Sequence, residues 1–229
     1  ETKTQFHFEI SADILKPQEL ELLRKAPKDR FQFEVGVQTT NDDVLNRINR
    51  FVNFSDIKEK VEELMSIRNI KQHLDLIAGL PGEDLESFHK SFDDVFSFYP
   101  KELQLGFLKL LRGTSLRKEA KKYGYVYDEN PPYELLYSND LSKEDIVKIH
   151  LAEDMLEKYW NSGKMKITMN KVMRKAASPF YFFLDLGNYY QLHHFKRIGY
   201  QNDELFKYLN EYLKGEYLDE LIEDYLLLT

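Results

Sequence analysis

Two stretches of the sequence decide the fold: FQFEVGVQTTN at residues 31–41 and HLDLIAGLPGED at residues 73–84. In the first, apolar and polar residues alternate up to Gln38, with the period of two that is typical of a strand. Asn41 and the two acidic residues after it are typical of a helix N-terminus. The second stretch has the same order of strand, tight turn and helix start. Each stretch therefore predicts one β–α unit.

Similar units flank these two stretches. Strand patterns occupy residues 5–10, 31–38, 73–78 and 102–111, and helical patterns occupy residues 17–25, 41–50, 55–68, 84–98 and 114–123. Strands that alternate with helices form a parallel sheet with right-handed crossovers. Ligands of such sheets bind beyond the carboxyl ends of the strands. We therefore expect a site near Ser11, Gln38, Gly79 and Lys109.

The second half of the chain has another character. Residues 123–140 have the composition of a loop and include Pro131 and Pro132. Only helical patterns follow, at residues 142–161, 164–175, 179–192, 203–214 and 216–227. We expect an α/β domain at residues 1–130 and an all-helical domain at residues 131–229.

Composition narrows the class of protein. The chain has 229 residues, 42% of them hydrophobic, with a formal net charge of −7 and no cysteine. The absence of cysteine excludes disulfides and any cysteine-ligated cluster within this chain. Acidic residues interspersed among the basic ones argue against a nucleic-acid partner. No apolar run is long enough to span a bilayer and no signal peptide is visible, so we expect a cytoplasmic protein without a membrane partner.

Individual side chains point to chemistry at the predicted edge of the sheet. Asp75 is an acid within an apolar strand, where it needs either a structural partner or a ligand. Arg50 closes the helix that follows Gln38, so it either returns to the same edge or pairs with an acid of its own helix such as Asp43. Glu9 faces either the site or solvent.

The combined pattern E-x-G-x-Q-[ST]…N-R…D-x-I-x-G-L-P-G-E resembles the middle of the radical S-adenosylmethionine family. The similar branch contains coproporphyrinogen dehydrogenase, the methylthiotransferases and the cobalamin-dependent enzymes. The resemblance covers residues 5–114 and implies the C-terminal four parallel strands of a partial (β/α)6 TIM-like barrel. It also implies a [4Fe–4S] cluster, bound S-adenosylmethionine, and hydrogen abstraction by a 5′-deoxyadenosyl radical.

The same resemblance implies a cofactor site drawn from all four strands, composed of Glu9, Gln38, Arg50, Asp75, Ile77, Leu108 and Lys109. Glu9 matches the strand glutamate that faces the cofactor. Gln38 and Arg50 match residues that contact the ribose and the methionine carboxylate, and Asp75 matches the aspartate near the ribose hydroxyls. Ile77 matches an apolar contact to adenine, and either Leu108 or Lys109 matches the last-strand position whose backbone reaches adenine. No catalytic residue and no metal ligand is implied within this chain.

The family's CxxxCxxC motif and its glycine-rich methionine-binding strand lie upstream of the matched segments, and this chain contains neither. The sequence also starts in the middle of a pattern, with Glu1. We therefore expect a fragment of a longer radical S-adenosylmethionine enzyme, inactive alone, whose missing N-terminal part carries the cluster ligands. Its expected partner is a small-molecule substrate.

Two segments refine the resemblance. LLRGTSLR at residues 110–117 and NPPYELL at residues 130–136 resemble the helical C-terminal domain of cobalamin-binding-domain radical S-adenosylmethionine proteins. These Fe–S oxidoreductases are similar to the anaerobic Mg-protoporphyrin IX monomethyl ester cyclase, which implies cobalamin as a further cofactor. The competing hypothesis is a non-catalytic α/β scaffold whose helical module binds a nucleotide or a protein partner. A third hypothesis, an enzyme that modifies tRNA, would need a basic extension, and this sequence shows none.

Three features of the second half have simple structural interpretations. His193 and His194 are adjacent, and neighbouring residues on a helix point about 100° apart, which disfavours a shared metal ion. The aromatic residues between Phe180 and Tyr190 are expected to form helix core or a domain-packing surface rather than to line a substrate pocket. The acidic stretch at residues 216–224 is expected to be a solvated helix face.

Overall fold

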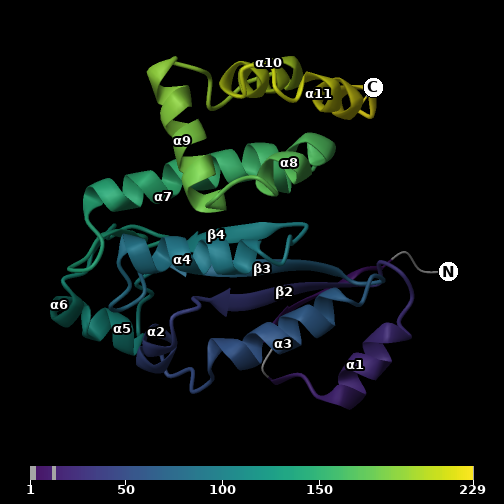
Figure 1. Ribbon diagram of the computed structural model, residues 1–229. Coiled ribbons are helices and arrows are strands. Elements are labelled where there is room, and N and C mark those ends of the chain that lie inside the picture. Colours follow the sequence, from purple (N-terminus) through teal and green to yellow (C-terminus); the bar gives the residue numbers. More distant parts are fainter. Residues whose placement is uncertain (1–3, 12–13, 229) are drawn as a thin grey trace. The chain divides into compact units, whose positions relative to one another are not determined.

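The computed structural model describes residues 4–11 and 14–228, and the chain divides into two compact units between Ile146 and Val147. The division lies later than the domain boundary predicted after residue 130. In the first unit, four strands form one parallel sheet in chain order. Their bounds are β1 (Phe6–Ile10), β2 (Phe31–Gln38), β3 (Lys71–Ala78) and β4 (Leu103–Phe107). The strands β2, β3 and β4 lie side by side in Figure 1. The predicted α/β fold with a parallel sheet is confirmed.

Helices connect the strands and supply most of the apolar partners of the sheet. They are α1 (Pro17–Arg24), α2 (Asp42–Arg47), α3 (Phe54–Met65), α4 (Leu85–Phe96), α5 (Ser115–Lys118) and α6 (Ala120–Tyr123). Asn41 caps α2 by accepting hydrogen bonds from two backbone amides, as predicted. The single helix predicted at residues 114–123 is wrong, because the backbone leaves helical geometry at Glu119 and divides it into α5 and α6.

The strand register gives the sheet two different faces. Val35, Leu74 and Leu105 belong to the apolar face, where they are buried with the apolar sides of the helices. The opposite face, called the polar face below, carries the residues that are in register across the strands: His7, Glu9, Glu34, Gly36, His73, Asp75, Ile77, Gln104 and Gly106. Side chains alternate between the faces of a strand, so the polar residues of all four strands lie on one side.

A short antiparallel ribbon follows the sheet, where the sequence predicts only loop. Its strands are β5 (Val126–Tyr127) and β6 (Leu135–Tyr137). Lys109 forms an antiparallel bridge with Glu134, so the chain after β4 pairs with the ribbon. The strand predicted to continue to Leu111 therefore leaves the parallel sheet after Phe107. Within the ribbon region, the Tyr125 hydroxyl donates a hydrogen bond to the Gly79 carbonyl at 3.1 Å.

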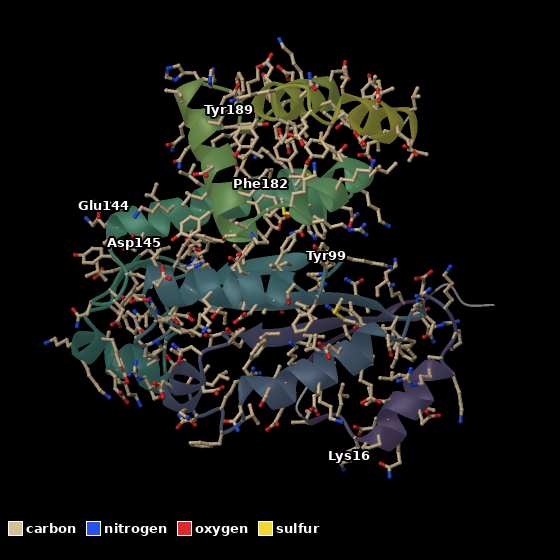
Figure 2. All side chains as sticks on the ribbon, viewed as in Figure 1. Lys16, Tyr99, Glu144, Asp145, Phe182 and Tyr189 are labelled. Atoms are coloured by element: carbon tan, nitrogen blue, oxygen red, sulfur yellow. The ribbon has the colours of Figure 1, made fainter. Side chains whose placement is uncertain are left out.

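The second unit is helical, as predicted. It contains most of α7 (Lys143–Leu156), the π-helix η2 (Glu157–Asn161), α8 (Lys166–Met173), α9 (Pro179–Leu192), α10 (Asn202–Tyr212) and α11 (Leu218–Leu226). Phe182 and Tyr189 lie on α9 (Figure 2), and both rings meet Tyr212 edge to face. Phe180 and Tyr190 are fully buried, so this aromatic cluster is helix core. No helix among the described residues is long and apolar enough to cross a membrane.

The prediction that residues 216–224 form a solvated face is wrong for Asp224. Its side chain is buried and accepts hydrogen bonds from the backbone amides of Ile167 and Thr168 at 2.9 and 2.8 Å. It also accepts one from the Thr168 hydroxyl at 2.8 Å. The carboxylate thus satisfies the free amides at the start of α8 and opposes the positive end of that helix.

Candidate functional site

The residues predicted for the cofactor site converge on one cavity. A cavity of about 320 Å³ is lined by residues of all four strands of the parallel sheet and of the segment that follows β4. Six of the seven predicted residues line it: Glu9, Gln38, Asp75, Ile77, Leu108 and Lys109. Of the four residues expected at the carboxyl edge of the sheet, Gln38 and Lys109 line the cavity, whereas Ser11 and Gly79 do not. The binding roles of the six lining residues stay predictions.

Gln38 occupies a strained position at the end of β2. Its φ of 73° is in the left-handed region, and the register between β2 and β3 shifts between Gly36 and Gln38. The side chain folds back over Gly36, where a Cβ atom would overlap the Nε2 atom of Gln38. Its Oε1 atom is buried and has no hydrogen-bond partner in the part of the chain that the structure describes. Such strain is held in place by surrounding structure and concentrates at ligand sites, which favours a binding role for Gln38.

Arg50 returns to the edge of the sheet. Asn49 adopts a left-handed backbone with φ 62°, which reverses the chain after α2. The guanidinium donates hydrogen bonds to the Gly36 carbonyl at 2.8 Å and to the Ser11 hydroxyl at 2.9 Å. Arg50 therefore bridges the ends of β1 and β2, and its partners among the described residues do not include Asp43. It stands beside the cavity rather than in its lining.

Asp75 has the most perturbed carboxyl group of the cavity. Burial, together with the nearby carboxylates of Glu34 and Glu9, raises the pKa of Asp75 to about 8. Its Oδ1 atom is buried and has no hydrogen-bond partner among the described residues. A purely structural carboxylate would have its oxygens satisfied, so the free oxygen favours the ligand alternative for Asp75.

A buried polar network joins the ends of β2 and β3. The Thr39 hydroxyl donates to Oε1 of Glu83 at 2.5 Å, and the Ser91 hydroxyl donates to the same oxygen at 3.3 Å. The Thr40 amide donates to the Ser91 hydroxyl at 3.1 Å. Burial raises the pKa of Glu83 to about 7, although both hydroxyl donors act against that shift. Thr39 and Glu83 both belong to the motif that resembles the radical S-adenosylmethionine family, but no role for either side chain was predicted from the sequence.

The cavity fits S-adenosylmethionine by the chemistry of its donors. Gln38 and Asp75 offer unpartnered oxygens to ribose hydroxyls. Ile77 and Leu108 offer an apolar wall to adenine. Glu9 adds a carboxylate that complements a sulfonium or ammonium charge. The [4Fe–4S] cluster does not fit, because this chain has no cysteine to ligate it.

Comparison with known families covers the part of the chain that supplies half of the residues lining this cavity. The family profile of the radical SAM superfamily matches residues 1–95, which are less than half of the chain. This part of the chain is similar to the radical SAM superfamily. A second profile, described as a protein of unknown function (DUF4080), matches residues 121–229. The radical SAM match confirms the predicted resemblance at the level of the superfamily.

Two curated proteins are similar to part of the chain. The heme chaperone HemW of Bacillus subtilis is 33% identical over 94 residues, which are 41% of this chain and 24% of that protein. The probable threonylcarbamoyladenosine tRNA methylthiotransferase of Pyrococcus abyssi is 28% identical over 94 residues, which are 41% of this chain and 22% of that protein. The chain thus spans about a quarter of the length of these relatives.

Solved structures of radical SAM proteins are also similar. Coproporphyrinogen III oxidase (HemN) of Escherichia coli has a TM-score of 0.49 and 22% identity, over 68% of this chain and 33% of its own. The radical S-adenosylmethionine methyltransferase TsrM of Kitasatospora setae, solved with cobalamin and a [4Fe–4S] cluster, has a TM-score of 0.44 and 15% identity. That match covers 56% of this chain and 27% of TsrM.

Proposed function

We propose that this chain supplies part of the S-adenosylmethionine site of a longer radical SAM enzyme that acts on a small molecule. The observation that carries the proposal is the convergence of six predicted residues on one cavity, with unpartnered oxygens on Gln38 and Asp75. The missing N-terminal part of the same polypeptide would hold the cluster. The chain alone is then inactive and binds the cofactor weakly.

Each residue has a task that its surroundings support. Gln38 and Asp75 accept hydrogen bonds from the ribose hydroxyls, since each has a buried free oxygen. Arg50 turns part of its five-donor guanidinium toward the methionine carboxylate and keeps its contacts to Gly36 and Ser11. Ile77 and Leu108 exclude water from adenine. S-adenosylmethionine would supply the radical chemistry once it is bound at a reduced cluster.

The test is a longer polypeptide that includes the upstream cysteine motif, reconstituted with iron and sulfide under reducing, oxygen-free conditions. We expect it to release 5′-deoxyadenosine. Asp75→Ala removes the acceptor and should lower this release at least about tenfold, the equivalent of losing one good hydrogen bond to the ligand. Glu59→Ala, which removes an exposed carboxylate on α3, is the matched control. Release by Asp75→Ala at the unaltered rate would refute the assigned role.

We further propose that the enzyme belongs to the cobalamin-binding branch, similar to the anaerobic Mg-protoporphyrin IX monomethyl ester cyclase. The support is the likeness of residues 110–117 and 130–136 to the C-terminal domain of that branch. Cobalamin bound to the purified longer polypeptide, detected by its visible absorption, would support this assignment. A longer polypeptide that carries the cluster motif but takes up no cobalamin would exclude it.

A further inference from the structure

Three side chains from three neighbouring strands meet on the polar face. They are His7 of β1, Glu34 of β2 and His73 of β3. The Nε2 atom of His7 is 3.2 Å from Oε2 of Glu34, and the Nε2 atom of His73 is 3.4 Å from the same oxygen. All three ligand atoms lie within 4.8 Å of one another. Two imidazoles therefore converge on one carboxylate oxygen.

Hydrogen bonding satisfies this cluster incompletely. The His73 side chain is only 6% exposed, and its Nε2 atom makes no hydrogen bond to the described residues although it is within ion-pair distance of the Glu34 carboxylate. A buried polar nitrogen without a hydrogen bond costs free energy. A metal ion between the two imidazoles and the carboxylate would satisfy it.

The spacing of the atoms is that of ligands around one metal ion. Zinc bonds of about 2.0–2.1 Å at tetrahedral angles place neighbouring ligand atoms roughly 3.3 Å apart. The two measured distances to the Glu34 oxygen, 3.2 and 3.4 Å, agree with that separation. Two imidazoles and one carboxylate are also a donor set that suits zinc and cobalt, whereas magnesium and calcium prefer oxygen ligands alone.

We propose that His7, Glu34 and His73 bind a divalent transition-metal ion of the zinc type. Glu9 and Asp75 lie on the same face as these ligands and add negative potential that attracts a cation. Oδ1 of Asp75 is 3.9 Å from Nε2 of His73 and offers a further oxygen. Three protein ligands leave one position open for that oxygen or for water.

This site adjoins the proposed cofactor contacts, because Asp75 is close to His73 and both Glu34 and Asp75 line the cavity. Glu34 precedes Gln38 by four residues, which is roughly 13 Å along a strand at 3.3 Å per residue. The ion would lie toward the beginning of the strands and would link β1, β2 and β3. Its binding requires neither S-adenosylmethionine nor the iron–sulfur cluster.

The experiment uses the 229-residue chain after removal of metal with a chelator. Zinc is titrated in competition with a chromophoric chelator, and Co²⁺ is titrated while the visible absorption is recorded. We expect one ion per chain, with cobalt bands typical of four-coordinate nitrogen and oxygen ligands. His7→Ala is the decisive variant, because the His7 side chain is 53% exposed and its removal should not disturb the core.

Removing a residue that only hydrogen-bonds to a metal ligand weakens metal binding about 10–100-fold. His7 is itself a proposed ligand, so His7→Ala should weaken zinc binding at least about 100-fold. Glu34→Gln should weaken binding similarly. His150→Ala removes a histidine paired with Glu153 on α7 and should leave zinc affinity unchanged. Zinc should raise the melting temperature of the unaltered chain but not that of His7→Ala. The proposal is wrong if the unaltered chain binds no stoichiometric zinc, or if folded His7→Ala binds zinc as tightly.

Discussion

Single residues at the end of β2 show how the chain holds its candidate site. Gln38 is strained, and its side chain lies in space that only a glycine at position 36 leaves free. Gly36 itself is not in the left-handed region, so its role is close packing rather than backbone freedom. The strand pattern of the sequence predicts neither the register shift nor the fold of the Gln38 side chain.

Gly36→Ala tests this arrangement. The added methyl group overlaps Nε2 of Gln38, so the Gln38 side chain must leave its position. The strand backbone at position 36 is compatible with alanine, because its φ is not in the left-handed region. We expect roughly tenfold weaker S-adenosylmethionine binding in the longer, reconstituted polypeptide, the effect of one lost hydrogen bond. Calorimetric titration measures this change. The control is Ser55→Ala, on the exposed side of α3 and outside the lining of the cavity. Equal losses in both variants would contradict the role given to Gln38.

Glu83→Gln tests the buried network at the motif. Burial raises the pKa of Glu83 from its ordinary 4.5 to about 7, so folding favours the neutral form. The stability that this provides is complete below pH 4.5 and is lost as the pH rises through 7. The variant keeps an acceptor for Thr39 and Ser91 but cannot ionise. At pH 8 it should be more stable than the unaltered chain, by at most about 3 kcal/mol.

Urea unfolding at pH 5 and pH 8 measures this effect. The stability difference between the two proteins should be small at pH 5 and should grow toward pH 8. Other titrating groups are common to both proteins and cancel in the difference. Parallel pH dependences would show that Glu83 stays ionised in the folded state.

At the scale of elements, the long periodic segments were predictable and the short ones were not. The β2 and α9 bounds agree with the sequence prediction. The strands β5 and β6 have two and three residues, too few for a period to be visible. Their pairing with each other and with Lys109 depends on contacts between distant parts of the chain.

The N-terminus of α8 depends on another helix. Asp224 of α11 accepts three hydrogen bonds there, and its side chain is buried. Asp224→Ala should lower the free energy of unfolding by about 3 kcal/mol, because buried donors lose a charged acceptor. Thermal unfolding followed by circular dichroism measures the loss. Asp219→Ala, an exposed acid in the first turn of α11, should change stability by less than about 0.5 kcal/mol. Similar effects of the two substitutions would contradict the capping role.

At the scale of the whole molecule, the chain consists of two compact units. The parallel sheet and the β5–β6 ribbon belong to the first, and α8 to α11 belong to the second. Local opening within a protein follows such cooperative units. A substitution in one unit is therefore expected to change the local stability of that unit first.

Hydrogen exchange in Asp224→Ala tests this expectation on the intact chain. Amide exchange should accelerate in α8 and α11, which the carboxylate links. The amides of β2, β3 and β4 should keep their protection, because they are bonded within the other unit. Mass spectrometry of peptic fragments measures both regions in one experiment. Acceleration of equal size in the sheet would mean that the two units open together.

By itself the sequence determined the α/β class, the parallel order of strands and helices, the helical second half and the resemblance of its first part to the radical SAM superfamily. These follow from periodicity and local motifs, which act over neighbouring residues. Only the tertiary structure decided that Arg50 returns to β2 and that Asp224 caps α8. The hydrogen bond between Thr39 and Glu83, which connects the segments that follow β2 and β3, also became visible only in the structure. The same is true of His7, Glu34 and His73, which stand on three strands. Strand register brings them together, and register depends on packing across the whole sheet.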